Sequence, residues 1–239
     1  MDTWSNIWSP GNRLHGEPTE LGSDKTLLEI GCGYGERLVK FADRGYQIVG
    51  VDVNETALES AARRLDGRFL LGAFEDIEFE PESFDVIRFD NVLDHSYEPK
   101  LFMEKVAGLL KPGGKCIGFV PNGRSASIRL LGKYSINNWV PYHITMFNKQ
   151  SLQDLTTQAG LVAEVRGIAN PHWFSLSVRQ YRYQRKTTGY SQLKAWDTRL
   201  STLVAAPLWA ALSRFGWGEE LVLTGTKSYN QYSNTAKGI

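Results

Sequence analysis

The sequence predicts an α/β fold in which helices cover both faces of a mostly parallel β-sheet. Three observations predict it. Short apolar runs alternate with segments whose apolar residues recur every three or four positions, as strands and helices require. A G-x-G-x-G turn follows the first apolar run, and an acidic residue ends the second. Strands that alternate with helices pair in parallel, because each helix returns the chain to the same end of the sheet.

The first five strands and three helices follow one another between residues 26 and 121. Asn54 is placed to cap the second helix and Gly45 to end the first, while a proline and two glycines turn the chain after the third. The expected strands are TLLEIG (26–31), QIVGVD (47–52), RFLLG (68–72), FDVIRF (84–89) and KCIGFVP (115–121). The expected helices are ERLVKFADRG (36–45), NETALESAARRL (54–65) and LFMEKVAGLLKPGG (101–114).

The pattern changes after Pro121. Residues 122–148 show little periodicity, and then SLQDLTTQAG (151–160) predicts a helix and LVAEVRGI (161–168) a strand. Before the last strand, EELVLTGTK (219–227), lie one basic and aromatic helical pattern (174–186) and one apolar pattern (196–214). The expected organisation is an N-terminal arm (1–24), one domain (25–227) that contains a helical insertion (169–219), and a flexible tail (228–239).

Composition argues against several classes of protein. The 239 residues carry a net charge of +1, which gives no bias toward nucleic acid or an anionic membrane. The start, MDTWSNIWSPG, lacks the basic and apolar regions of a signal peptide, and the apolar run 200–213 is broken by Pro207 and too short to span a membrane. Cys32 and Cys116 match neither a metal-binding spacing nor a disulfide framework. We therefore expect a cytoplasmic protein with reduced thiols.

The stretch LLEIGCGYGERLVKF (27–41) places Gly31, Gly33 and Gly35 between a strand and a helix. Parallel sheets bind ligands at the carboxyl ends of their strands, and glycine lets the backbone approach a ligand closely. Asp52 ends the next strand, 21 positions after Gly31 (52 − 31), where an acid accepts hydrogen bonds from ribose hydroxyls. A tight turn followed by a helix-capping acid is the simpler alternative. The combination of strand, loop, helix and acid favours a nucleoside site.

The spacing of the glycines indicates which nucleoside is favoured. A dinucleotide-binding turn reads G-x-G-x-x-G and directs a helix N-terminus at a pyrophosphate. Here the third glycine comes one residue earlier, and Glu29 lies two residues before the first. The carboxylate of Glu29 would repel a pyrophosphate and attract a cation. S-adenosylmethionine offers an ammonium, a sulfonium and a ribose.

LLEIGCGYGERLVKFADRGYQIVGVDVNETALESAARR resembles the first two motifs of class I S-adenosylmethionine-dependent methyltransferases. GAFEDIEFEPESFDVIRFDNVLDHSYEP resembles their adenine loop, fourth strand and active-site edge, and LKPGGKCIGFVPN their fifth strand. The chain is most similar to the branch with ubiquinone-pathway O-methyltransferases and small-molecule or sugar methyltransferases, which often carry P-x-H-x-x-x-F after that strand. Here the element comprises Pro141, His143 and Phe147. The resemblance implies a Rossmann-like sheet of seven strands, parallel except for the last.

The resemblance also implies which residues surround the methionine end of the cofactor. The glycine loop would line the methionine part and the sulfonium, the acid before it would face the amino end, and the end of the fourth strand would lie beside the reacting methyl group. These residues are Gly31, Cys32, Gly33 and Gly35 in the loop, Glu29 before it, and Asp90 and Asn91 after the fourth strand.

On the adenosine side, the resemblance implies that Asp52 holds the ribose hydroxyls and that Val53 packs on adenine. Phe74 and Glu75 would flank the adenine. This chain departs from many relatives in one place, because Ala73 stands where they have an acid after the glycine of the adenine loop. Adenine would then be recognised by backbone groups or by Glu75.

Two histidines are candidates for the catalytic base. A hydroxyl acceptor is a poor nucleophile until its proton is removed, and a neutral imidazole accepts a proton near neutral pH. His143 ranks first because it lies in the loop after the fifth strand. His95 follows the fourth strand, within NVLDH, and is the second candidate.

A metal site is not expected. Some ubiquinone-pathway relatives hold a divalent cation at the edge after the fourth strand with an acid followed by an acid-histidine pair. The corresponding positions here are Asn91, Asp94 and His95, so one carboxylate is replaced by an amide. Magnesium prefers carboxylates and water, which makes this set a poor site. A capping role for Asp94 is favoured.

The sequence thus predicts an enzyme that transfers a methyl group from S-adenosylmethionine to a small molecule, at oxygen first, with nitrogen or carbon as alternatives. Arginines and a lysine lie at helical spacing within residues 174–186. A solvated helix face is the favoured interpretation, and contact with an anionic or sugar-linked acceptor, or with a partner, is the alternative. The insertion would cover the acceptor pocket, with a homodimer face as the alternative. Two rivals stay open: a nicotinamide-dependent oxidoreductase, and a catalytically silent cofactor-binding subunit.

Overall fold

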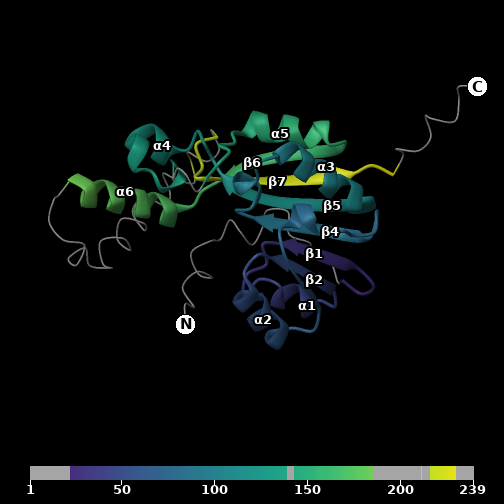
Figure 1. The fold of residues 1–239 in the computed structure, drawn as a ribbon. Helices are drawn as coiled ribbons and strands as arrows, with labels where there is room; N and C mark the ends of the chain where they lie inside the picture. Colours follow the sequence, from purple (N-terminus) through teal and green to yellow (C-terminus); the bar gives the residue numbers. More distant parts are fainter. Residues whose placement is uncertain (1–21, 139–142, 186–210, 212–215, 230–239) are drawn as a thin grey trace, which may run out of the picture. The chain divides into compact units, whose positions relative to one another are not determined.

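The computed structural model describes residues 22–138, 143–185, 211 and 216–229 (Figure 1). Within them the strands form one seven-stranded sheet in the order β3-β2-β1-β4-β5-β7-β6. The sheet is mostly parallel with an antiparallel edge, as predicted. The strands are β1 (Thr26–Ile30), β2 (Gln47–Asp52), β3 (Arg68–Leu71), β4 (Phe84–Asp90), β5 (Leu110–Pro121), β6 (Leu161–Ile168) and β7 (Glu220–Lys227).

Six helices accompany these strands in the described part of the chain. They are α1 (Val39–Ala42), α2 (Glu55–Arg64), α3 (Pro99–Leu109), α4 (Ala126–Leu131), α5 (Lys149–Gln158) and α6 (Pro171–Arg185). Short 3₁₀ segments follow several strands, among them η1 (Phe74–Asp76), η2 (Leu93–His95), η3 (Gly132–Tyr134) and η4 (Ile136–Asn138).

The chain divides into two compact units, and each is described by itself. The glycine-loop unit comprises Pro18–Gly118, Gln153–Glu164 and Leu223–Ile239. The loop-rich unit comprises Met1–Glu17, Phe119–Leu152 and Val165–Val222. The first contains the glycine loop, the adenine loop and the end of β4, and the second contains His143 and most of the predicted insertion.

In the glycine-loop unit, β1 lies between β2 and β4 and pairs in parallel with both. The register places Glu29 opposite Gly50 on one side and Arg88 on the other. Leu27 and Leu28 are fully buried, as expected for a central strand that is covered on both faces. Because parallel strands end at the same edge, the carboxyl ends of β1, β2 and β4 bring Glu29, Asp52 and Asp90 to one edge of the sheet.

A cluster of buried aromatic rings, Phe74, Phe89 and Phe102, packs next to the end of β4. The rings of Phe89 and Phe102 meet edge to face with centroids 5.4 Å apart, and Phe74 lies 4.9 Å from Phe102. All three side chains are at most 3% exposed. Burying such rings is worth about 2 kcal/mol or more each, so β4, α3 and the adenine loop are held together by the same cluster.

One helix prediction was confirmed and one was wrong in length. The second helix is confirmed as α2, where the Asn54 side chain accepts a hydrogen bond from the Ala57 amide at 3.1 Å. The prediction for residues 36–45 was wrong in length, since α1 covers only Val39–Ala42. Before it, the Leu38 amide donates to the Gly35 carbonyl three residues back, and Gly35 has a φ of +72°. Hydrogen bonds over three residues are those of tight turns, which here replace the first part of the predicted helix.

Two boundaries also moved. β5 begins at Leu110, five residues before the predicted start, because Leu110 is already extended and a residue before proline, as Lys111 is, is driven to the same conformation. α6 begins at Pro171 rather than residue 174, after Asn170 accepts a hydrogen bond from the Trp173 amide at 3.3 Å.

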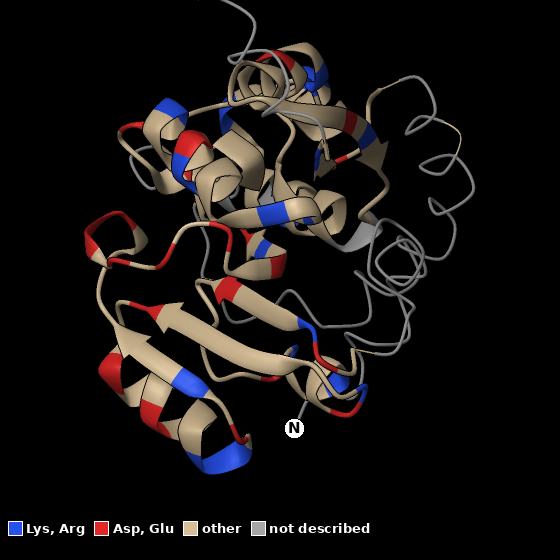
Figure 2. Ribbon diagram, turned by 90° about the vertical axis from the view of Figure 1, so that its right-hand side faces the viewer, with Lys and Arg blue, Asp and Glu red and all other residues tan. Residues whose placement is uncertain are grey.

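Several predictions fall on residues that the structure does not describe. The N-terminal arm lies almost wholly outside the described residues, as do nearly all of the apolar pattern 196–214, Pro141 and most of the tail. Among the described residues, none of the helices has both the length and the hydropathy needed to cross a membrane. Figure 2 shows acidic and basic positions interspersed along the described elements, as in α2, which has Glu55 in its first turn and Arg63 and Arg64 in its last.

Candidate cofactor site

The glycine loop leaves the carboxyl end of β1 in a conformation that favours glycine. Gly31, Gly33 and Gly35 have φ values of +71°, +52° and +72°. A Cβ atom on Gly31 would come within 2.5 Å of a Val92 side-chain carbon. L-residues rarely adopt such values of φ, and the contact with Val92 adds a steric reason at Gly31. The pattern seen in the sequence is therefore a structural requirement of this turn.

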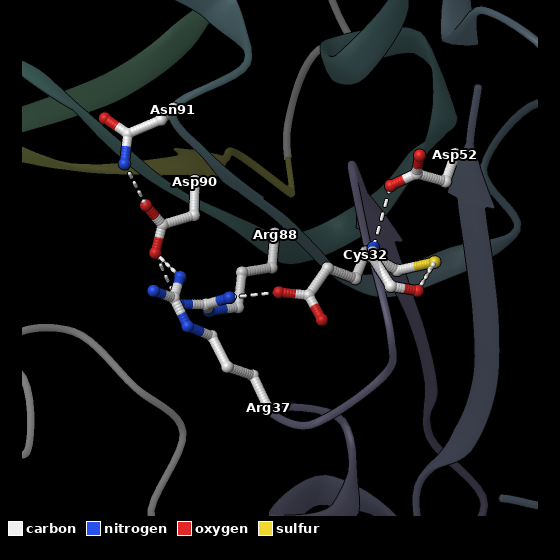
Figure 3. A network of polar contacts seen from close by, with 8 residues as sticks. Cys32, Arg37, Asp52, Arg88, Asp90 and Asn91 are labelled. Carbon is white, nitrogen blue, oxygen red and sulfur yellow. Dashed lines mark hydrogen bonds and ion pairs between the residues drawn. The ribbon is translucent and has the colours of Figure 1, made fainter. Parts of the chain in front are cut away.

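Asp52 fastens this loop to the end of β2. One carboxylate oxygen accepts a hydrogen bond from the Gly33 amide at 2.7 Å, and the other accepts one from the Asn54 amide at 2.9 Å (Figure 3). Each oxygen keeps a second lone pair. The two predicted cofactor motifs, 21 positions apart (52 − 31), thus meet at one carboxylate that can still accept hydrogen bonds from a ligand.

A cavity of about 310 Å³ opens beside the loop. Its volume lies at the lower end of small-molecule sites. Five predicted cofactor residues line it together with three residues that were not predicted. The lining residues are Glu29, Gly31, Cys32, Asp90 and Asn91, and in addition Tyr34, Glu36 and Arg37.

A network of acidic and basic side chains lies beside this cavity, and three of its members, Glu29, Arg37 and Asp90, line it. Glu29 and Arg88 are each 2% exposed and form a buried ion pair between β1 and β4. Arg88 also reaches a carboxylate oxygen of Asp90 at 3.3 Å, and Arg37 pairs with the same oxygen (Figure 3). The second carboxylate oxygen of Glu29 is buried without a hydrogen-bond partner. Burial raises the pKa of Glu29, and the positive charges of Arg88 and Arg37 oppose that rise.

Asp90 and Asn91 end β4 in a constrained turn. Asn91 has a φ of +53°, and its side-chain amide donates to the Asp90 carboxylate at 2.8 Å. A non-glycine residue in this region costs on the order of 1 kcal/mol, which the surrounding structure must supply. Backbone strain of this kind is common where a side chain must be aimed at a ligand. Both residues line the cavity.

Cys32 lies in the loop but is not a nucleophile. Its side chain is 7% exposed, and burial, with contributions from Asp52 and Glu29, raises the pKa of the thiol to about 12. The protonated thiol is the inert form at neutral pH. A Cβ atom on Gly50 would lie 2.8 Å from its sulfur, so a small residue there leaves space for Cys32.

The adenine loop is held by a lysine that the sequence did not reveal. The Lys105 ammonium, from α3, donates to the backbone carbonyls of Phe74, Glu75 and Ile77 at 2.7, 2.9 and 2.7 Å. Ser96 donates to the exposed Glu75 carboxylate at 3.0 Å. Phe74 is 3% exposed, so its ring belongs to the core and its backbone is the part left for a ligand. Val53, at 73% exposed, offers an open apolar surface.

Each of the two candidate histidines has a polar neighbour. His95 has its Nε2 atom 3.5 Å from the carboxylate of the buried Asp94. In the loop-rich unit, the Nδ1 atom of His143 lies 3.0 Å from the backbone carbonyl of Asn137. A carbonyl only accepts, so Nδ1 carries the hydrogen and Nε2 of a neutral His143 keeps its lone pair.

Phe147, at the far end of the predicted P-x-H-x-x-x-F element, is buried in the loop-rich unit. Its carbonyl accepts a hydrogen bond from the Gly123 amide at 2.7 Å. Nearby, Asn122 is 1% exposed and donates through its side chain to the carbonyls of Gly216 and Gly218. These contacts fix the segment after β5 at both ends.

The same unit contains a buried carboxyl group that was not predicted. Glu219 is fully buried and accepts hydrogen bonds from the amide and hydroxyl of Ser127 and from the side chain of Asn137. Burial raises the pKa of Glu219 to about 7, although the hydrogen bonds from Ser127 oppose the rise. This cluster joins α4, η4 and the start of β7.

Of the residues that the sequence analysis missed, Arg88 left a signal in the sequence. Arg88 is the one basic residue inside the apolar strand FDVIRFD, and Glu29 is likewise the one charge within TLLEI. Two buried charges on neighbouring strands usually pair. The parallel register then makes each the other's partner.

Residues 28–118 match a family of methyltransferase domains. A ubiquinone biosynthesis O-methyltransferase of Idiomarina loihiensis is 35% identical over 128 residues, which are 49% of this chain and 51% of the relative. The enzyme of the same description from Ruegeria pomeroyi is 31% identical over 160 residues, 59% of this chain and 64% of the relative. The chain thus spans between about half and just under two thirds of the length of these curated relatives.

Solved structures share the fold. One is a chain of the complex between the Haloferax volcanii Trm112 methyltransferase activator and a methyltransferase, with a TM-score of 0.61, 20% identity, and coverage of 88% of this chain and 84% of that one. Another is phosphoethanolamine N-methyltransferase 2 of Haemonchus contortus with S-adenosylmethionine, with a TM-score of 0.59, 18% identity, and coverage of 94% and 53%. Residues 28–118 thus resemble the methyltransferase domains of the class I, S-adenosylmethionine-dependent type.

Proposed function

We propose that this protein transfers a methyl group from S-adenosylmethionine to a small-molecule acceptor, at oxygen in the first place. The observation that carries the proposal is the Asp52 carboxylate, which holds Gly33 of the glycine loop at 2.7 Å beside a cavity lined by Glu29. An acid with free lone pairs suits ribose hydroxyls, and a buried carboxylate oxygen without a partner suits an ammonium. The donor set therefore fits this cofactor.

When bound, S-adenosylmethionine supplies a methyl group that its sulfonium activates for in-line displacement. The chain's own residues would do the rest. Asp52 would accept hydrogen bonds from the ribose hydroxyls, with Val53 against one face of adenine and the backbone of Phe74 and Glu75 at its edge. The glycines and Cys32 would let the loop backbone approach the sulfur, and Asp90 and Asn91 would border the space beside the methyl group.

For the acceptor, we propose His143 as the general base. A hydroxyl gains nucleophilicity as its proton leaves, and Nε2 of His143 is the lone-pair nitrogen when Nδ1 donates to Asn137. His95, beside Asp94, would instead orient the segment after β4. The proton taken by His143 would return to solvent after each turnover.

Two observations bear on the chemical class of the methyl acceptor. The curated relatives are named ubiquinone biosynthesis O-methyltransferases, which favours oxygen over nitrogen or carbon. The basic stretch that α6 contains supports an anionic or sugar-linked molecule. We further propose a cytoplasmic enzyme that does not act on nucleic acid, with the insertion 169–219 covering the acceptor or forming a homodimer face.

Replacing Asp52 by alanine should weaken binding of S-adenosylhomocysteine by about 2 kcal/mol, roughly 30-fold, because the ribose hydroxyls and the Gly33 amide lose a charged acceptor. Asp52→Asn, which keeps one carbonyl oxygen, should weaken it less. Isothermal titration calorimetry measures both. The exposed Asp66→Ala serves as the control and should leave the affinity unchanged. An Asp52→Ala protein with wild-type affinity would remove Asp52 from the site.

A further inference from the structure

The charges around the cavity match only half of the cofactor's methionine end. Three lining residues are acidic, namely Glu29, Glu36 and Asp90. Among the described residues that line it, Arg37 carries the one positive charge. The methionine end has both an ammonium and a carboxylate. The acids can receive the ammonium, but they repel the carboxylate, so that group needs a cation.

The two arginines of the network differ in how readily they can change partners. Arg88 is 2% exposed and pairs with the equally buried Glu29, and breaking such a pair costs about 3–5 kcal/mol. The side chain of Arg37 is 51% exposed. Because one partner is half exposed to water, solvent screens this pair more than the buried pair of Arg88 and Glu29. The contact between Arg37 and Asp90 is therefore the exchangeable one.

Asp90 does not become an isolated charge when Arg37 leaves it. Its side chain is 9% exposed, and the Arg88 guanidinium stays within 3.3 Å of the same oxygen. The second carboxylate oxygen of Asp90 accepts a hydrogen bond from the Asn91 amide at 2.8 Å. The pair can open without leaving a buried carboxylate uncompensated, which is the usual reason that such exchanges are costly.

We propose that Arg37 recognises the α-carboxylate of the cofactor. In this exchange Arg37 leaves Asp90 and takes the carboxylate in the two-pronged geometry that guanidinium favours. The ammonium takes its place against Asp90 and the buried, unpartnered oxygen of Glu29. Arg37 thereby selects ligands that carry a complete amino-acid end over shorter adenosine thioethers. The inference rests on the proposed function, because it assumes that the cofactor binds in this cavity.

Three ligands separate the contributions of the two groups. S-adenosylhomocysteine has the ammonium and the carboxylate, S-adenosyl-3-thiopropylamine has the ammonium alone, and 5′-methylthioadenosine has neither. In calorimetry, Arg37→Gln should weaken S-adenosylhomocysteine about 30-fold, the loss expected for one charge-assisted pair. Its affinity for the other two ligands should change by less than about threefold. Arg37→Lys, which keeps the charge but not the fork, should recover part of the loss.

The control is Arg63→Gln, because Arg63 is 70% exposed, pairs with Glu59 on α2 and does not line the cavity. Equal weakening of all three ligands by Arg37→Gln would overturn the inference and show that Arg37 only supports the loop. Unchanged affinity for S-adenosylhomocysteine in Arg37→Gln would also overturn it. If the wild-type protein bound none of the three, the proposed function would fail first, so the two failures are distinguishable.

Discussion

Raising the pH from 5 to 8 should lower the free energy of unfolding by about 2.5 kcal/mol through Glu219 alone. Burial raises the pKa of this carboxyl to about 7, against 4.5 for a solvated glutamate. Above pH 4.5 the unfolded chain loses the proton while the folded protein keeps it. Stability from this group is therefore complete below pH 4.5 and falls as the pH rises through 7.

The neighbours of Glu219 explain why its ionised form is disfavoured. The cluster offers hydroxyl and amide donors from Ser125, Ser127 and Asn137, while the negative charge of Glu220 raises the pKa further. Hydrogen bonds stabilise the carboxylate in part, but no cation from the described elements of this cluster is among the causes of the pKa shift. Desolvation is therefore the larger effect.

Urea unfolding of wild type and Glu219→Gln at pH 5, 6, 7 and 8 tests this prediction. Between pH 5 and 8 the free energy of unfolding of Glu219→Gln should change by about 2.5 kcal/mol less than that of the wild type, whatever its absolute stability. The exposed Glu80→Gln controls for general changes in charge and should follow the wild type. Parallel curves for wild type and Glu219→Gln would contradict a raised pKa at this position.

Replacing His143 by alanine should lower turnover by about 100-fold or more, the lower end for loss of a general base. The Nδ1 bond to Asn137 leaves Nε2 as the acceptor in the neutral ring, so the alanine removes the nitrogen that would take the hydroxyl proton. The affinity for S-adenosylhomocysteine should stay nearly the same. Release of S-adenosylhomocysteine with the best hydroxyl acceptor from a small-molecule screen is the readout.

Two comparisons make the His143 result specific. His143→Gln keeps a side-chain donor for the Asn137 carbonyl but has no basic nitrogen, so it should be as slow as the alanine variant. His95→Ala should lower turnover less, or lower stability and turnover together. Near-normal turnover of His143→Ala from pH 6 to 9 would show that alignment of the acceptor suffices, or that the acceptor arrives already deprotonated.

The strands could be predicted well because their signal is local. β2 and β6 have the predicted bounds. Each begins just after a glycine turn, at Gly45 and Gly160, and apolar residues recur along each strand. The length of the first helix could not be predicted. Tight turns hold residues 35–38 after the glycine loop, and the spacing of apolar residues does not report the backbone conformation there. The strand β5 began early for a related reason, the extended residues before Pro112.

The glycine loop and Asp52 could be placed from sequence because their spacing is set by one βαβ unit. The partners that support the site could not, because they are distant in sequence. Arg88 pairs with Glu29 across 59 positions, and Ser127 bonds Glu219 across 92. Lys105 reaches backbone carbonyls 28 to 31 residues away, and a lysine on an amphipathic helix gives no sign of such contacts. Only the folded sheet brings these groups together.

One calorimetric experiment tests the proposed cofactor most directly, a titration of the wild-type protein with S-adenosylhomocysteine and, separately, with NAD⁺. The glycine spacing, the buried Glu29 and the Asp52 carboxylate predict a dissociation constant in the micromolar range for S-adenosylhomocysteine, about −8 kcal/mol. They predict no measurable binding of NAD⁺, whose pyrophosphate would face the carboxylates of the cavity. Tight binding of NAD⁺ with none of S-adenosylhomocysteine would contradict the proposal.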